Sequence, residues 1–410
     1  METTAAEEVF IPDVPPNFGQ LLQSRRAEAN LTIAALAKKT GLTRNTIVNI
    51  EQGSTTPSPQ TMRRLLAVKA LRLLETGTGE GPSVEAWFTK AYNPIDLIDG
   101  MTALLNGPGG RIEQTYLYLD PRSAVDYFVL CNTAEYVAAY REKIPHDQIA
   151  ERIIKESKGV GLDVDGLGCG DGKSETALIQ RLADRMPEPP DLQLYLLDIS
   201  HVLLSEGYRT ALNSLAPRRI PVFGIHGSFT DISKNPVLFA HPLTVKRLRV
   251  FTLYGGTFGN INDEPWFFQD LEACSQPGDL LVIDCQLVRA PADQPELIRA
   301  AEPLLKNGQP PETHHKFLTG PLKRHCEGLT HIKLRSVLSP HCLVPGSYAI
   351  EFWGDVDVEY EPKRRFLIQR VKRYDLDKLS TFLSTLGWKT LQTWKYGPGK
   401  LAGVLLAQRQ

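Results

Sequence analysis

Apolar side chains in the first seventy-five residues recur at helical spacing, in short groups separated by stop signals. Thr32 and Thr43 precede two of these groups and can cap helices, while Gly41 suits a helix end at positive φ. Between Asn17 and Leu74 we therefore expect four short helices. Their apolar faces are Phe18/Leu21/Leu22, Ile33/Leu36/Ala37, Ile47/Ile50 and Met62/Leu65/Leu66/Val68.

The pattern changes after Gly161, where short apolar runs alternate with amphipathic stretches such as Ser174–Arg185. This alternation predicts a parallel sheet with helices on both faces, an α/β doubly wound, Rossmann-like fold. A helix at Phe382–Leu386 and two further strands are expected to close the sheet. The predicted strands are Leu162–Leu167, Gln193–Leu197, Ile220–Ile225, Arg249–Tyr254, Leu280–Asp284, Trp388–Tyr396 and Leu401–Leu406.

These patterns divide the 410 residues into segments, which a chain of this length needs because one core rarely serves so many residues. We expect a flexible acidic tail at 1–16, an all-α domain at 17–75 and a Gly-rich linker at 76–83. A largely helical connecting region follows at 84–150, and the α/β domain at 151–410.

Composition is that of an ordinary globular protein, with 42% apolar and 23% charged residues. The acidic N-terminal residues do not resemble a signal peptide, and the apolar runs are strand-sized, so we expect a cytoplasmic protein without a membrane span. The six cysteines include no C-x-x-C pair, and the His/Cys-rich stretch from His314 to Cys342 lacks the paired spacing of zinc ligands, so we expect no metal site.

The net charge of −1 hides a local excess of positive charge. Residues 17–75 carry nine Lys/Arg and three Glu, a difference of +6, whereas residues 1–16 carry four acids and no base. A short basic segment of this kind is typical of domains that contact a phosphate backbone.

The same segment resembles the Cro/CI-type repressor family, a helix-turn-helix family, in the pattern Leu36-Ala37, Gly41-Leu42-Thr43, Thr46-Ile47 and Ile50-Glu51-Gln52-Gly53. The resemblance implies that Arg44, Asn45 and Asn49 face DNA bases, with Thr43 and Thr46 nearer the phosphates. It also implies a homodimer on paired half-sites. The alternative is a helical module that mediates dimerisation or protein contacts.

A second motif follows the first predicted strand of the α/β domain, where Gly168, Gly170, Gly172 and Lys173 form a G-x-G-x-G-K turn into a helix. Glycines let the backbone turn sharply and a ligand approach closely. Asp198 ends the next strand, where a carboxylate can accept both hydroxyls of a ribose. This pair resembles the nucleotide site of class I S-adenosylmethionine methyltransferases, which implies S-adenosyl-L-methionine as cofactor.

The third strand leads to Ser228 and Phe229, and the resemblance implies that adenine lies against Phe229. Two positions depart from the family pattern. Gly166 stands where the motif usually has an acid, a role that Asp165 could take, and Ser228 stands where an adenine-reading Asp is common.

After the fourth strand, the segment Tyr254-Gly255-Gly256-Thr257-Phe258-Gly259-Asn260 resembles the histidine-specific methyltransferase family, which includes the L-histidine Nα-methyltransferase of ergothioneine biosynthesis. The resemblance spans about residues 115 to 410. It implies cofactor contact by Tyr254, substrate binding and a catalytic role for Asn260, and substrate binding by Tyr118. The family's other pocket residues fall near Gln369, Val371 and Ala301 and do not carry over, so we do not expect free histidine as substrate.

These observations leave two hypotheses open. The first is an S-adenosylmethionine-dependent N-methyltransferase of a small amine, with a DNA-binding head. The second is a transcriptional regulator whose inactive methyltransferase domain senses S-adenosylmethionine or another metabolite. DNA base methylation is not expected, because Gly255–Phe258 replaces the Pro-Pro tetrad of amino-directed DNA methyltransferases and the sequence has no Pro-Cys dipeptide.

Overall fold

The computed structural model describes residues 18–29, 31–55, 57, 61, 64, 65, 68, 86–90, 94–234, 247–306, 308–340 and 342–410. The chain divides into two compact units, Met1–Thr89 and Lys90–Gln410, and a short strand, β1 (Ala86–Lys90), spans their boundary. The expected tail at 1–16, the expected linker at 76–83 and most of the expected fourth helix lie outside the described residues.

The first unit contains three short helices, α1 (Phe18–Glu28), α2 (Ile33–Thr40) and α3 (Arg44–Glu51), which confirms the helices predicted there. Thr32 and Thr43 cap α2 and α3, and Gly41 ends α2 at a φ of 66°. The Arg26 guanidinium donates to both carboxylate oxygens of Glu51, which braces α1 against α3. Their small core consists of Phe18, Leu22, Leu36, Ala37, Ile47, Ile50 and Leu65.

The second unit is built around a large sheet to which it contributes seven strands, in the order β5-β4-β3-β6-β7-β12-β11. The first five are parallel, and the last two are antiparallel to their neighbours. This arrangement confirms the predicted α/β class. The strands are β3 (Gly161–Leu167), β4 (Leu192–Asp198), β5 (Val222–His226), β6 (Arg247–Leu253), β7 (Leu280–Gln286), β11 (Trp388–Tyr396) and β12 (Ala402–Arg409).

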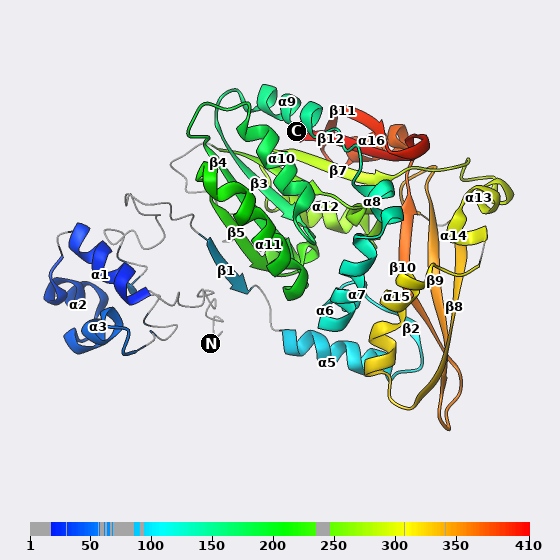
Figure 1. Ribbon diagram of the computed structural model, residues 1–410, viewed down its shortest axis with the longest axis horizontal. Helices are drawn as coiled ribbons and strands as arrows, with labels where there is room; N and C mark the ends of the chain where they lie inside the picture. The colour runs from blue at the N-terminus through cyan, green and yellow to red at the C-terminus, as the bar shows by residue number, and fades with distance from the viewer. Residues whose placement is uncertain are drawn as a thin grey trace, which may run out of the picture. The chain divides into compact units, whose positions relative to one another are not determined.

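Helices cover both faces of this sheet because its strands are apolar on both sides. On one face, alternate residues such as Leu281 and Ile283 pack with α12 (Glu264–Glu272) and α16 (Leu376–Thr385). Figure 1 shows α10 (Lys173–Ala183) and α11 (His201–Leu215) side by side over β3, β4 and β5, next to α9 (His146–Ser157).

A second sheet was not expected from the sequence. It has the order β2-β10-β9-β8, and its three long strands β10, β9 and β8 are antiparallel to one another. These strands are β8 (Leu329–Ser339), β9 (Tyr348–Val358) and β10 (Arg364–Arg373), and β2 (Gly110–Arg111) pairs parallel to β10. Residues 329–373 therefore do not extend the large sheet.

The second sheet packs against helices from chain segments that precede and follow the parallel strands in the sequence. These are α5 (Pro94–Leu105), α6 (Tyr116–Leu119) and α15 (Glu312–His325), which share one core with β8, β9 and β10. The helices α7 (Pro121–Cys131), α8 (Ala134–Tyr140), α13 (Pro295–Ala301) and α14 (Pro303–Lys306) complete the unit. In the described part of the chain, every helix is too short or too polar to cross a membrane.

Candidate functional site

The main cavity of the second unit lies at the carboxyl ends of β3, β4, β5 and β6 and has a volume of about 290 Å³. In doubly wound sheets this edge is where ligands bind, because the loops there diverge from a topological switch point. The cavity is lined by Glu113, Gln114, Thr115, Tyr118, Tyr127, Gly168, Gly170, Asp198, Ile199, Leu203, Ser228, Phe229, Thr230, Thr257, Asn260, Ile261, Asn262, Asp263, Trp266 and Phe267. Seven of these are residues that the sequence singled out: Tyr118, Gly168, Gly170, Asp198, Ser228, Phe229 and Asn260.

The glycine loop follows β3 directly and lines one wall of this cavity. Gly168, at a φ of 66°, approaches the Thr257 methyl and the Phe229 ring so closely that a Cβ would lie 2.9 and 3.0 Å from them. Gly170, at a φ of 55°, faces open space. Gly172 serves packing instead, because its Cβ would lie 3.0 Å from the backbone of Gly207 in α11. The loop thus leaves room for a ligand beside Gly170.

Asp198 ends β4 next to this loop, and its side chain is buried. Its two oxygens accept hydrogen bonds from the backbone N–H groups of Gly170 and Ser200, both at 2.8 Å. Burial raises the pKa of Asp198 to about 6, and the N–H groups partly offset that effect. The carboxylate lines the cavity, where it can accept from the hydroxyls of a ribose.

The predicted adenine-binding residues line the main cavity beside Gly168. Phe229 packs edge-on against Phe267, with ring centroids 6.1 Å apart, and both rings line the cavity. The Ser228 hydroxyl accepts from the backbone N–H of Thr230 at 3.2 Å and bonds its hydroxyl at 2.8 Å. An apolar wall therefore faces the carboxylate of Asp198 across the cavity.

The turn after β6 presents Asn260 to the same cavity. Asp284, at the end of β7, accepts from the backbone N–H of Gly255 at 2.9 Å and from the Tyr396 hydroxyl at 2.5 Å. Phe258 is fully buried, so it anchors the short 3₁₀ helix η5 (Thr257–Asn260) in the core below. These contacts fix the turn that carries η5. The half-buried Asn260 amide makes no hydrogen bond to the described residues around it.

Tyr118 reaches the cavity from α6, in a region far from Asn260 in sequence. Its ring packs edge-on against Tyr127 at 4.9 Å and against Phe317 at 5.2 Å. The two predicted substrate-binding residues, Tyr118 and Asn260, therefore line one cavity with the glycine loop.

Three predicted cofactor residues, Gly172, Lys173 and Tyr254, do not line the main cavity. Tyr254 is buried beside a smaller cavity of about 30 Å³ on the other side of the glycine loop. Lys173 is half exposed, and its ammonium donates to Asn132 at 3.0 Å and pairs with Asp171 at 3.2 Å. Lys173 thus ties the loop to the segment that joins α7 and α8.

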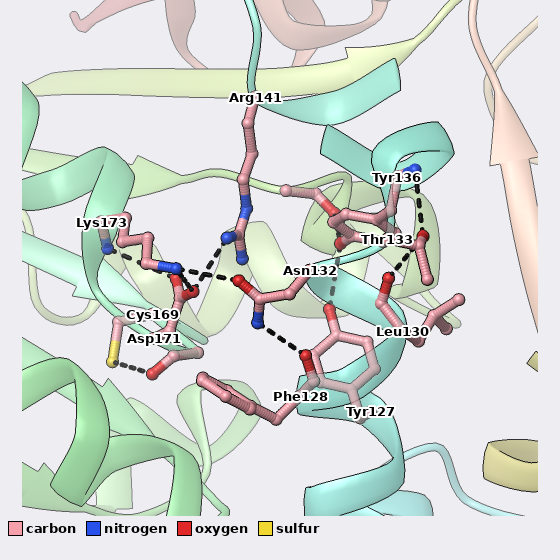
Figure 2. A network of polar contacts seen from close by, with 12 residues as sticks. Tyr127, Phe128, Leu130, Asn132, Thr133, Tyr136, Arg141, Cys169, Asp171 and Lys173 are labelled. Carbon is pink, nitrogen blue, oxygen red and sulfur yellow. Dashed lines mark hydrogen bonds and ion pairs between the residues drawn. The ribbon is translucent and has the colours of Figure 1, made fainter. Parts of the chain in front are cut away.

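Figure 2 shows the contacts between that segment and the loop. Arg141, just after α8, pairs with Asp171 at 2.8 Å. The Tyr127 and Tyr136 hydroxyls bond each other at 3.2 Å, and Tyr136 donates to the Gly255 carbonyl at 3.2 Å. Helices α7 and α8 are therefore fastened to both loops that shape the site.

Asp165 does not take the role left open by Gly166. Its carboxylate pairs with Arg249 at 3.1 Å, and both side chains are almost fully buried within the sheet. Side chains of neighbouring residues in a β-strand point to opposite faces of the sheet, so Asp165 points to the face opposite to that of a side chain at position 166. The prediction that Asp165 takes the role of the acid usual at position 166 is therefore wrong.

Several cavity residues were missed by sequence reasoning, among them Glu113, Gln114, Tyr127 and Trp266. The aromatic run from Tyr116 to Tyr136 was a signal for Tyr127, whereas Trp266 is recognisable only by its 58% exposure. Gln369, Val371 and Ala301 lie outside the cavity lining. The Gln369 amide oxygen instead bonds the half-buried His314 ring at 3.0 Å.

The residues proposed to face DNA lie together on α3 of the first unit. Thr43, Arg44, Asn45 and Asn49 are exposed and Thr46 is half-buried. The Thr43 hydroxyl caps the helix through the backbone N–H of Thr46 at 3.1 Å. The exposed face of α3 therefore offers a guanidinium and two amides, groups that read base edges.

The second unit fits S-adenosylmethionine on three observations: open space beside Gly170, a buried carboxylate that lines the cavity at Asp198, and the apolar rings of Phe229 and Phe267. Asp198 would hold the ribose, and Phe229 would hold the adenine.

Comparison with known proteins agrees with this geometry. Residues 17–73 match a family model described as a helix-turn-helix domain. Residues 95–301, half of the chain, match the model of the histidine-specific, S-adenosylmethionine-dependent methyltransferases. A search of curated protein sequences finds no match.

Solved structures with a similar fold are distant. They include an S-adenosylmethionine-dependent methyltransferase from Clostridium acetobutylicum (12% identity, 69% of this chain and 95% of that chain, TM-score 0.33). They also include the sugar N-methyltransferase KedS8 from Streptoalloteichus (12%, 70% and 92%, 0.35). A third is the magnesium protoporphyrin IX methyltransferase from Synechocystis (12%, 72% and 97%, 0.36). At this distance they do not bear on the substrate. The family match does bear on the cofactor, because this family uses S-adenosylmethionine. The chain therefore belongs to the histidine-specific methyltransferase family and carries a helix-turn-helix domain at residues 17–73.

Proposed function

We propose that this protein transfers a methyl group from S-adenosylmethionine to the nitrogen of a small amine, and that its helix-turn-helix domain binds DNA. The observation that carries the enzymatic part is the position of Asn260. Its half-buried amide lines the same cavity as Gly170 and Asp198, the residues that suit the cofactor.

The charges around the cavity support an amine as methyl acceptor. Among the described residues that line it are three acids, Glu113, Asp198 and Asp263, and no lysine, arginine or histidine. A negative lining favours cationic or hydrogen-bond-donating molecules and disfavours a free carboxylate that brings no partner of its own. The exposed ring of Trp266 at the cavity edge adds a face on which a cation can lie.

The chemistry asks little of the protein beyond placement. When bound, S-adenosylmethionine supplies a methyl group already activated by a positive sulfur. The Asn260 amide oxygen can accept an N–H of the amine, which orients the nitrogen without giving it a proton. Tyr118 and Tyr127 line the cavity with aromatic rings, which limits the access of water.

Asn260→Ala tests the assignment. We expect methyl release from S-adenosylmethionine in the presence of the best substrate of an amine panel to fall by about 100-fold, because misplacing the acceptor costs that much. Affinity for S-adenosylhomocysteine, measured by calorimetry, should stay within about twofold, since Asn260 serves the acceptor. Asn213→Ala, at an exposed position of α11, is the matched control and should behave as the wild type.

Cofactor binding without turnover on any amine would contradict methyl transfer. It would favour the alternative function, a regulator that uses the methyltransferase domain to sense the cofactor.

The DNA-binding part is supported by the exposed face of α3 and by the local charge of +6 from nine Lys/Arg and three Glu in residues 17–75. Domains of this kind bind paired half-sites as dimers, so we infer a homodimer on DNA. DNA binding would then couple transcription, including that of the protein's own gene, to methyl-group metabolism.

A further inference from the structure

Asp198 and Phe229 account for the adenosine half of the cofactor and leave its amino-acid half without a partner. That half carries an α-ammonium and an α-carboxylate, which need an acceptor and a donor inside the protein. The glycine loop lines the main cavity on one side and the smaller cavity on the other. A bound cofactor can therefore contact this loop from both cavities.

The smaller cavity continues the main one along the loop. The two share Tyr127, Gly168, Gly170, Leu203 and Thr257. Asp198 lines only the main cavity, whereas Glu175 lines only the smaller one. A ligand whose ribose lies at Asp198, and which extends along the glycine loop into the smaller cavity, therefore reaches Glu175.

Glu175 reaches this position because Gly166 makes room for it. A Cβ on Gly166 would lie 2.8 Å from Cγ of Glu175 and 3.4 Å from Cδ. The backbone of Gly166 is ordinary extended strand, so the absence of a side chain there serves space and not conformation. A carboxyl from the first turn of α10 thus fills the place beside β3 that a side chain at position 166 would fill.

Among the described residues, no cationic side chain forms an ion pair with the Glu175 carboxyl, so its surroundings suit a cation from a ligand. The carboxyl is 1% exposed, and burial raises its pKa to about 8. The two nearby cations, Arg141 and Lys173, both pair with Asp171 (Figure 2). In the same cavity the buried Tyr254 hydroxyl has no hydrogen-bond partner among the described residues. An acceptor and a donor therefore face one small cavity.

We propose that Glu175 binds the α-ammonium of the cofactor, in the place of an acid at position 166, and that the Tyr254 hydroxyl bonds the amino-acid end beside it. Asp198 and Glu175 then hold the two ends of one ligand across the glycine loop. This assignment rests on the use of S-adenosylmethionine and not on the identity of the methyl acceptor.

Calorimetry with two ligands tests it: S-adenosylhomocysteine, and 5′-methylthioadenosine, which has the same adenosine but no amino-acid group. Glu175→Gln keeps the size of the side chain but cannot ionise beside the ammonium, as the carboxyl can. It should weaken S-adenosylhomocysteine by about 10- to 100-fold, the loss expected for a hydrogen bond to a charged group. Its affinity for 5′-methylthioadenosine should stay within about twofold of the wild type.

A relocated acid tests the geometry. Glu175→Ala should lose affinity for S-adenosylhomocysteine, and the double variant Gly166→Asp/Glu175→Ala should regain about tenfold of it, because the carboxyl then enters the same space from β3. A double variant no tighter than Glu175→Ala would contradict the shared position.

Equal weakening of both ligands by Glu175→Gln, or no weakening of either, would overturn the inference and leave Glu175 a packing residue. A wild-type protein that binds neither ligand would instead overturn the assignment of the cofactor. The two failures are therefore distinguishable.

Discussion

Asp198 combines a buried carboxyl with a specific set of donors. The backbone N–H groups of Gly170 and Ser200 hold it in place, and the residue lines the cavity. Because burial raises its pKa to about 6, the carboxyl changes charge in a pH range that is easy to reach. The ribose hydroxyls of a cofactor donate to the ionised form, so ligand binding and ionisation favour each other.

This coupling predicts a pH dependence that Asp198→Asn removes. With a pKa of about 6, the ionised fraction falls from about nine-tenths at pH 7 to about one-tenth at pH 5. The ratio of wild-type to Asp198→Asn affinity for S-adenosylhomocysteine should therefore fall by about tenfold between these pH values, because the wild type loses its advantage as Asp198 gains a proton. Calorimetry on both proteins measures the ratio. A ratio that stays constant would show that Asp198 does not accept from the ligand in its ionised form.

Among individual residues, the sequence predicted the cavity residues that lie in a loop or at the end of a strand. Gly168, Gly170, Asp198 and Asn260 all line the cavity because the carboxyl ends of parallel strands meet at one edge of a sheet. Lys173 and Tyr254 do not line it, because a side chain at the same edge can still point to the far side of the loop.

Glu175 could not be predicted in this way, since its importance depends on a contact between a helix and a glycine of the preceding strand. Nor could the pairing of Asp165 with Arg249 be predicted, because it joins residues 84 positions apart across neighbouring strands.

Among the elements, α3 of the first unit carries the proposed contact with DNA. Its inner face is fixed by Ile47 and Ile50 and by the pairing of Glu51 with Arg26. The side chain of Arg44 is exposed at the first turn, the part of a recognition helix that meets base edges.

Arg44→Ala should therefore weaken DNA binding without unfolding the domain. The probe is the duplex that the full chain binds most tightly from a randomised pool, and fluorescence anisotropy gives the affinity. We expect a loss of about tenfold, the usual cost of removing one arginine contact with a base. Arg209→Ala, on the exposed side of α11, removes the same charge from the other unit and should have no effect. Failure to enrich any duplex, or an equal loss in both variants, would contradict DNA binding by α3.

The elements that the sequence predicted are those with a clear local signal. The Thr32 and Thr43 caps and Gly41 delimit α2 and α3, and the five parallel strands are buried apolar runs between helices. The strands β8, β9 and β10 were missed as a separate sheet. The first half of β9, Tyr348–Phe352, is buried on both faces, so it lacks the alternation of apolar and polar side chains that marks a strand with one exposed face.

In the whole molecule, two units with separate cores share one chain. The first has the small core of α1, α2 and α3, and the second holds the α/β sheet together with the sheet of β8, β9 and β10. The site itself draws on both parts of the second unit: α6 and α7 contribute Tyr118 and Tyr127, and the large sheet contributes the loops that face them. A change at the cofactor site should therefore act on the second unit and leave the fold of the first intact.

Titration of the full chain with S-adenosylhomocysteine, beside Asp198→Ala and the surface control Asp184→Ala, tests the central claim most directly. The wild type and Asp184→Ala should bind with one site per chain and equal affinity, and Asp198→Ala should bind about 10- to 100-fold more weakly, because a buried carboxylate then no longer accepts from the ribose. Absence of binding by the wild type, or equal affinity in all three proteins, would contradict a cofactor site between the glycine loop and Asp198.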